Sequence, residues 1–396
     1  MKKVLLISPF ILSLTLGNFF DTIDIKGKMG FESSYINHSI SDKRDNQIAF
    51  RGEVKVKKSF EFGKVILGVK RVFDFQDKKR RYVEITDAYF KHSFEDSDIS
   101  IGRKTNFWGA MEFYNHTDNF NTKDFRDNPF DYDSKLGAWN LDYTYYFENS
   151  ELSLIAKVHQ EEQKPQGKKS VNNFFPAIYK GKLETQSNIN RPSFYVKYSG
   201  SAEEVQLDYS LIYENGYDEQ RYFVFDKKSF KLKQHAYIAN KLMGYATYVN
   251  GETIYKTELA ITRNQDTTVS NYAQLSFGVE HTLYGVVGKS DLGLLAEYYR
   301  YEAFDDNKRG AKEFGNLFAN DVTLGFRATF NDGKDSAILG GLAIDIDNKE
   351  KIFFVDYDTR VYNSYKVNLS YQHLEPTDES VFSKLDRLSL TLGYYF

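Results

Sequence analysis

The chain ends in Arg387-Leu388-Ser389-Leu390-Thr391-Leu392-Gly393-Tyr394-Tyr395-Phe396, where two kinds of side chain alternate. Every second residue from Leu388 to Phe396 is apolar or aromatic, and most of those between are small or polar. Because successive side chains of a β-strand point to opposite faces, this segment predicts a strand with one apolar and one polar face. An apolar stripe with an aromatic edge, backed by a polar face, is typical of a transmembrane β-barrel strand.

The same alternation recurs from about residue 22 onward, and no segment has a convincing helical period. We therefore predict an all-β fold of about 18 strands, an even number as in bacterial single-chain barrels, with 16 as the alternative count. The expected strands lie near residues 22–37, 46–59, 63–76, 80–94, 97–108, 136–147, 150–161, 192–201, 203–215, 232–249, 252–264, 271–284, 290–303, 320–331, 335–347, 351–361, 364–375 and 386–396.

The connections between these strands alternate in length. Tight turns such as Glu61-Phe62-Gly63 and Asn250-Gly251 have residue types that short hairpins use. Between them lie longer polar connections at 38–45, 109–135, 162–191, 216–231, 304–319 and 376–385. Short turns on one rim and long loops on the other predict a single transmembrane antiparallel β-barrel, with short periplasmic turns, long external loops and both termini on the periplasmic side.

Composition excludes several classes of protein. Hydrophobic residues make up 41% and charged residues 27% of the 396 residues, so a bundle of spanning helices is excluded. The 30 Tyr and 33 Phe suit strands with an aromatic girdle. There is no Cys, which excludes disulfides and thiolate metal sites. The formal net charge of −3 argues against a nucleic-acid partner.

The N-terminus has the layout of a signal peptide. Lys2 and Lys3 form a short basic region, Val4 to Leu16 is apolar, and small residues precede a cut before Asn18. We expect residues 1–17 to be the signal peptide and residues 18–396 to form the barrel domain. Export from the cytoplasm follows from this reading.

Two motifs resemble the broad family of Gram-negative outer-membrane porins. The C-terminal residues Leu392, Tyr394 and Phe396 are similar to the signal that the barrel-assembly machinery recognises. Residues 101–129, with Gly102-Arg103, Trp108-Gly109, Asp118 and Asn128-Pro129, are similar to a pattern in porin-like and alginate-export-like barrels, although Lys104 stands where those relatives often have Gln. The resemblance implies an outer-membrane location, with membrane lipid, lipopolysaccharide and the assembly machinery as partners; a homotrimer is one option for its assembly.

The connection at 109–135 would be the third external loop, which in porins commonly folds into the lumen and makes the constriction. Its acids outnumber its bases by about three, and the candidate constriction residues are Glu112, Asp118, Asp124, Asp127 and Asp131. The expected lumen wall is richer in bases, including Arg51, Lys70, Lys104, Arg327, Arg360 and Arg387. An acidic loop opposite a basic wall would set a transverse field. The alternative is that these are solvated charges on a wet face.

The facing of Arg103 stays open at this level. Strict alternation from Ile99 and Ile101 places Arg103 on the outer face, so a bulge would be needed to turn it inward.

The expected function is a porin that passes small hydrophilic solutes or ions by passive diffusion, without cofactor or bound metal. The alternatives are a substrate-selective or export channel working with periplasmic partners, and a structural or adhesive surface barrel based on loops 162–191 and 216–231. An outer-membrane enzyme is not expected, because Ser153 and His159 lie roughly 20 Å apart along one strand. The seven His are scattered without a helical i, i+4 pair, which disfavours a metal site.

Overall fold

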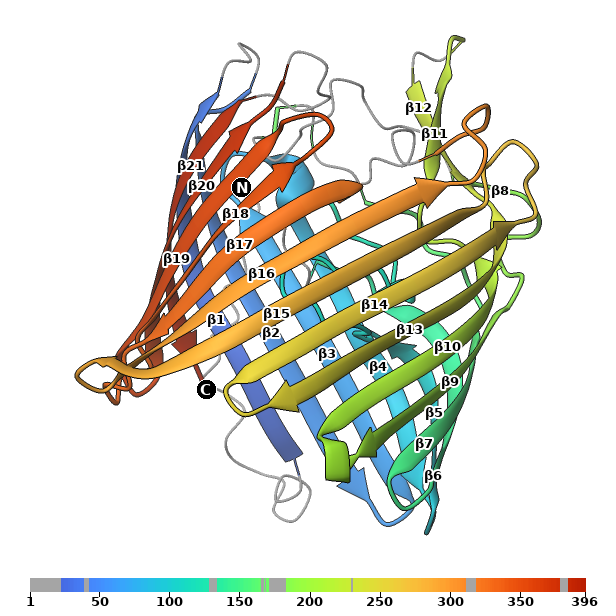
Figure 1. Cartoon of the computed structure of the whole chain (residues 1–396), viewed down its shortest axis with the longest axis horizontal. Helices are drawn as coiled ribbons and strands as arrows, with labels where there is room; N and C mark the ends of the chain where they lie inside the picture. The colour runs from blue at the N-terminus through green and yellow to red at the C-terminus, as the bar shows by residue number, and fades with distance from the viewer. Residues whose placement is uncertain are drawn as a thin grey trace, which may run out of the picture.

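A computed structural model describes residues 23–38, 43–127, 134–164, 167, 169–170, 183–228, 231–310, 318–377 and 384–396. Eighteen of its strands form one antiparallel sheet that closes on itself (Figure 1). They are β1 (Ile23–His38), β2 (Asn46–Phe60), β3 (Gly63–Asp74), β4 (Arg81–Ser93), β5 (Ser97–Lys104), β6 (Ala138–Tyr146), β7 (Ser150–Lys157), β9 (Ser193–Ala202), β10 (Leu207–Tyr217), β13 (Ile238–Asn250), β14 (Thr253–Asn264), β15 (Tyr272–Val287), β16 (Ser290–Ala303), β17 (Asn320–Thr329), β18 (Ala337–Asp345), β19 (Lys351–Tyr362), β20 (Tyr365–Glu375) and β21 (Leu385–Tyr395).

The barrel closes where the first strand meets the last. β1 pairs with β2 on one side and with β21 on the other, with Phe31 opposite Leu392. The two backbone groups of Phe396 exchange hydrogen bonds with those of Gly27, at 2.8 and 3.0 Å. The predicted single antiparallel barrel is therefore confirmed, and the strand count is 18 rather than 16.

The two faces of the wall differ as the alternation predicts. Leu388, Leu390 and Leu392 are exposed on the outside, whereas the intervening Ser389 is buried on the inside. Because the outer face would contact lipid, its exposed apolar side chains need no protein partner. The inner face carries the polar groups that a wide barrel leaves in contact with water or with an inserted segment.

The two ends of the barrel differ in the length of their connections. One end, here called the short-turn end, has connections such as 61–62, 147–149, 251–252 and 363–364. At the tip of the 251–252 turn, Gly251 has φ 59°, a conformation that suits glycine. The opposite end, here called the long-loop end, carries the connections 105–137, 158–192, 218–237 and 304–319.

One predicted strand was wrong in its extent. The segment 232–249 contains two strands, β12 (Lys231–Ala236) and β13, which separate at Tyr237. β12 pairs with β11 (Tyr222–Asp226) and β8 (Glu184–Thr185) in a small sheet at the long-loop end (Figure 1). The alternation of side chains continues through this break. The sequence period alone therefore could not show that β12 pairs with β11 whereas β13 pairs with β10.

A second boundary also differs from the prediction. The expected strand 203–215 begins only at Leu207, because η2 (Glu203–Val205) turns the chain first and Gln206 has φ 52°. The other short helix within the described ranges is η1 (Lys78–Arg80), and none of the helices found there is long and apolar enough to cross a membrane. Residues 1–17 lie outside the described residues, so the signal peptide stays a prediction.

Candidate functional site

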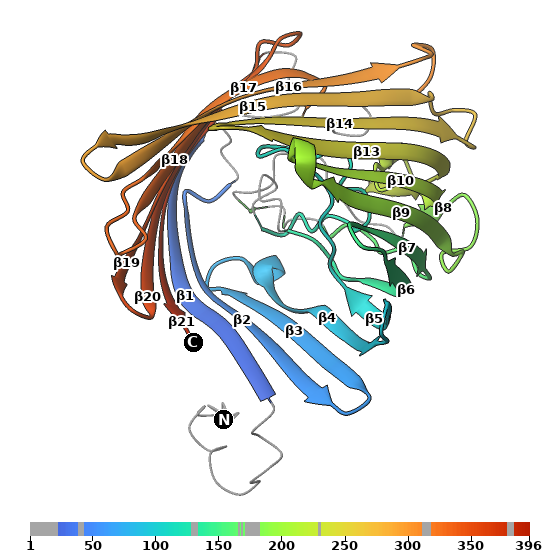
Figure 2. The same ribbon diagram turned by 60° about the horizontal axis from the view of Figure 1, so that its bottom comes forward.

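The segment that joins β5 to β6, residues 105–137, enters the barrel; we call it the inner segment, and its residues 128–133 lie outside those described. Its rings of Trp108 and Phe120 pack on inward-facing Tyr195, with ring centroids 5.5 and 5.1 Å away. These three belong to a buried cluster completed by Ala138, Ile155, Ile212, Met243 and Ala260 from β6, β7, β10, β13 and β14. Figure 2 shows the segment within the ring of strands.

Buried glutamates of the wall accept hydrogen bonds from backbone and side-chain groups of the inner segment. Glu258 on β14 accepts hydrogen bonds from the Ala110 N–H at 2.7 Å and the Thr117 N–H at 3.1 Å. Glu214 on β10 accepts one from the Asn119 side-chain amide at 2.8 Å. Since a buried N–H without a partner is costly, these carboxylates fix where the segment can lie.

A third glutamate continues this set along the wall. Glu297 on β16 accepts hydrogen bonds from the backbone N–H groups of Glu112, at 2.8 Å, and Phe113, at 3.2 Å. The Tyr299 hydroxyl accepts from the Tyr114 N–H at 3.2 Å. Glu214, Glu258 and Glu297, here called the glutamate clamp, thus bind successive groups of one segment from three different strands.

Two glycines make room for Phe113. Gly325 on β17 lies opposite Gly341 on β18. A Cβ on Gly341 would lie 2.6 Å from Phe113 Cζ, and one on Gly325 would lie 3.1 Å from it. The Phe113 ring also makes an edge contact with Phe354, 5.5 Å between centroids. The glycine pair therefore acts as a socket for this ring.

Asp127 anchors the other end of the inner segment to the opposite wall. Its carboxylate accepts hydrogen bonds from Arg51 at 2.9 Å, Arg80 at 3.0 Å and the Tyr82 hydroxyl at 2.7 Å. Lys70 lies 3.0 Å away. Burial tends to raise the pKa of Asp127, but Arg51, Lys70 and Arg80 outweigh it and hold the pKa well below its usual range. The side chain is therefore charged at any ordinary pH.

The other predicted loop acids are also in direct ion pairs. Glu112 pairs with Arg327 of the wall, while two acids pair within the segment itself, Asp118 with Lys135 and Asp124 with Arg126. Asp131 lies outside the described residues. Of these loop acids, Glu112 and Asp127 thus meet bases of the wall in direct contact, whereas Asp118 and Asp124 are paired within the segment.

The predicted wall bases do not form one group. Arg51 and Lys70 converge on Asp127, and Arg327 meets Glu112. Lys104 pairs with its neighbour on β6, Asp142. Arg360 lies at the short-turn end, where it pairs with Asp335 at 2.7 Å and is remote from the inner segment in the fold.

Arg103 faces inward. Its guanidinium pairs with Glu84 at 3.1 Å and with Glu161, and its side chain is 9% exposed. Gly102 before it has φ 139°, and β4 has a register irregularity against β3 opposite Gly68. These local breaks turn the side chain away from the lipid face that strict alternation predicts.

Sequence reasoning missed the buried partner of the wall bases. Glu32 on β1 pairs with Arg51 at 2.7 Å, Arg387 at 3.2 Å and Arg80 at 3.5 Å. It also missed the glutamate clamp, although each of its members alternates with exposed outer residues. The signal that could have identified Glu32 and the glutamate clamp is the presence of acidic residues at inward-facing positions of the long strands.

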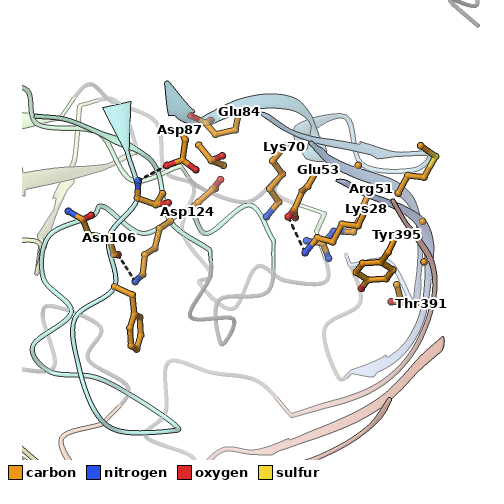
Figure 3. A pocket seen from close by; sticks show the side chains of 18 residues that line it. Lys28, Arg51, Glu53, Lys70, Glu84, Asp87, Asn106, Asp124, Thr391 and Tyr395 are labelled. Carbon is orange, nitrogen blue, oxygen red and sulfur yellow. Dashed lines mark hydrogen bonds and ion pairs between the residues drawn. The ribbon is translucent and has the colours of Figure 1, made fainter. Parts of the chain in front are cut away.

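Two of the cavities in the described part of the chain lie beside the inner segment, and Arg51 and Thr391 line both. The first cavity, about 450 Å³, is lined by Lys28 and Arg51 on one side and by Asp87 and Asp124 on the other (Figure 3). The second, about 410 Å³, has a polar side with Glu32, Arg51, Arg387 and Gln372 and an apolar side with Phe113, Phe318, Ile352 and Phe354.

Comparison with protein-family models and with curated proteins gave no match. Solved structures are similar across nearly the whole chain. OccD3 (OpdP) of Pseudomonas aeruginosa is 11% identical with a TM-score of 0.56 over 95% of this chain and 91% of that one. OccAB4 of Acinetobacter baumannii is 9% identical with a TM-score of 0.58 over 94% and 98%. A loop-deletion mutant of OmpT, an outer membrane protein of Vibrio cholerae, is 11% identical with a TM-score of 0.50 over 95% and 99%. At such identities the likeness concerns the fold, an outer-membrane-type barrel.

Proposed function

We propose that this chain is an outer-membrane porin of a Gram-negative bacterium that passes small hydrophilic solutes and ions by passive diffusion. The observation that carries the proposal is a closed barrel, apolar outside, with charged cavities of about 410 and 450 Å³ beside a segment inserted in its lumen. In this proposal the short-turn end is periplasmic, the long-loop end is external, and the inner segment forms the constriction.

Each cavity is lined by similar numbers of cationic and acidic side chains. This balance favours general diffusion over a channel lined by charges of one sign. The first cavity has four cations (Lys28, Arg51, Lys70, Lys135) and four acids (Glu53, Glu84, Asp87, Asp124). The second has three cations (Arg51, Lys123, Arg387) and four acids (Glu32, Glu112, Asp118, Asp356). An export channel for a polyanion would be expected to present an excess of one sign along the path. We therefore expect weak selectivity between cations and anions.

An enzymatic role has little support in the lumen. Ser153 shares a hydrogen bond with Thr144 at 2.8 Å, and His159 one with Asn190 at 2.7 Å. A nucleophile needs a base within hydrogen-bond reach, and these two side chains are held by different partners.

Planar-bilayer recording of the purified full chain tests the proposal. We expect stepwise conductance and a cation-to-anion permeability ratio near one. Heat-denatured protein is the control for detergent artefacts. Absence of conductance steps at any voltage would overturn the pore, and a strong preference for one sign of ion would overturn general diffusion.

A further inference from the structure

Two arginines lie side by side on the outer face near the long-loop end. Arg71 is on β3, three residues before the strand ends at Asp74, and Arg81 begins β4. Arg71 lies opposite Val83, and Arg81 lies opposite Phe73, so the two arginines are diagonal neighbours on one face of adjacent strands. Both side chains are exposed.

The surroundings of this pair are apolar and face outward. Val83 is 60% exposed and Phe75 51% exposed beside the pair, and Leu67 lies below it on β3. The Arg81 guanidinium lies over the Phe73 ring, 4.9 Å from its centroid. Two cations are thus embedded in the side of the barrel that would contact lipid.

Neither arginine has an acidic partner within the described part of the chain. Arg81 donates to the backbone carbonyls of Asp74, at 2.7 Å, and Phe75, at 2.9 Å, and Arg71 makes no ion pair there. By contrast, Arg300 lies at the same end of β16 on the outer face, opposite exposed Leu275, and pairs with Glu302 at 2.5 Å. Among the described residues, an acid compensates the charge of Arg300, whereas none compensates the charges of Arg71 and Arg81.

We infer that Arg71 and Arg81 form a binding site for the phosphate groups of lipid A, the phosphorylated glycolipid of the outer leaflet. Guanidinium groups match phosphate oxygens with paired hydrogen bonds. The acyl chains of the same lipid would lie along Leu67 and Val83. The site goes beyond solute passage and rests on the proposed outer-membrane location, since the long-loop end must face the lipid A leaflet.

Lipid binding to the purified full chain in detergent, measured by native mass spectrometry, tests this inference. The probes are bis-phosphorylated lipid A, the same lipid without its phosphates, and phosphatidylglycerol. We expect the wild type to prefer the phosphorylated lipid A, and Arg71→Gln to weaken its binding by about fivefold, as for one cation near an anionic surface. Arg71→Gln/Arg81→Gln should weaken it further, by more than about tenfold.

Arg300→Gln is the matched control, because it removes a paired arginine at the same end and should leave lipid A binding unchanged. Arg81 also donates hydrogen bonds to the β3–β4 turn, so its replacement removes structural contacts. If the double variant misfolds, lipid A binding by the single variant Arg71→Gln tests the inference. Equal binding of the phosphorylated and dephosphorylated lipids, equal binding of phosphatidylglycerol, or an unaffected Arg71→Gln would overturn the site. Conductance of the same samples separates this outcome from failure of the porin proposal.

Discussion

At the scale of single residues, Asp127 concentrates more charge contacts than any other loop acid described here. Its partners Arg51, Lys70 and Arg80 come from β2, β3 and η1. Because these elements meet only in the folded barrel, the sequence could nominate Asp127 as a loop acid but could not assign its partners. The inward orientation of Arg103 could not be predicted from the sequence either, because it depends on a local break in strand register.

Replacing Asp127 by Asn should loosen the inner segment. Removing one member of a buried ion cluster costs up to about 3–5 kcal/mol. Arg51, Lys70 and Arg80 would lose this counter-ion, and among the described acids the two arginines would keep Glu32 and, for Arg80, Asp74. We expect noisier single-channel currents and higher mean conductance in planar bilayers. Asp335→Asn is the control, since its carboxylate is exposed at the short-turn end and should change nothing. Currents identical to the wild type would contradict the anchoring role.

His116 should make the inner segment sensitive to acid. Burial, aided by Lys123 and Lys241, lowers the pKa of His116 to about 3, below its ordinary 6.5. The released segment therefore binds a proton more readily than the packed one, so packing is weakened as the pH falls below 6.5 and is unaffected above it. At pH 5 the cost is about 2 kcal/mol.

Recordings between pH 7.5 and 5 should thus show more frequent conductance fluctuations in the acid range. His116→Gln removes the titrating ring and should reduce this dependence, whereas Asp127 stays charged throughout and contributes no change. An acid response that persists in His116→Gln would assign it to another group.

At the scale of elements, the strands were predictable because lipid imposes an apolar residue at every second position. Some of their boundaries followed from turn residues such as Asn250-Gly251, whereas those at Leu207 and Tyr237 did not. The insertion of the inner segment into the lumen was predicted by resemblance to porins. The side chains that hold the segment there were not predicted. Clamp contacts such as Glu258 with Thr117 join residues far apart in sequence, and no local period reports them.

The glycine socket on β17 and β18 gives a test of how the inner segment is seated. Gly341→Ala would place a methyl group 2.6 Å from Phe113 Cζ, so the ring must move at a cost of about 1–3 kcal/mol. We expect altered conductance that Phe113→Ala restores in part in the double variant, because Phe354 Cε1 would still lie 2.8 Å from the added methyl group. Gly293→Ala, whose Cβ would have no neighbour nearer than 3.6 Å, is the control. Wild-type conductance in Gly341→Ala would show that the ring is not confined.

At the scale of the whole molecule, the segments of alternating polarity predicted about 18 strands, with 16 as the alternative, and the alternation of short and long connections predicted a barrel. Eighteen strands close the ring. The small sheet of β8, β11 and β12 was missed because β8 and β11 lie in segments that resemble polar loops and β12 was merged with β13 in one predicted strand. The expected roles of Leu392, Tyr394 and Phe396 in assembly stay a prediction, although Phe396 also has a structural position at the seam.

Removal of Phe396 should therefore impair formation of the barrel. The residue contributes both backbone hydrogen bonds to Gly27, and its ring occupies the space beside that glycine. We expect several-fold less heat-modifiable, folded protein on gels after expression. Phe330→Ala, an aromatic truncation in a short turn away from the seam, should have a much smaller effect. Equal yields of the two variants would contradict a special role for the terminal residue.

The pairing of β1 with β21 also constrains the order of biogenesis. β1 keeps an unsatisfied edge until β21 has been synthesised and pairs with it. Since hydrocarbon tolerates no open edge, we expect a chain that lacks β21 to have no stable membrane form, and closure of the barrel to wait for that strand. The cell must shield every such chain from self-association during its transit.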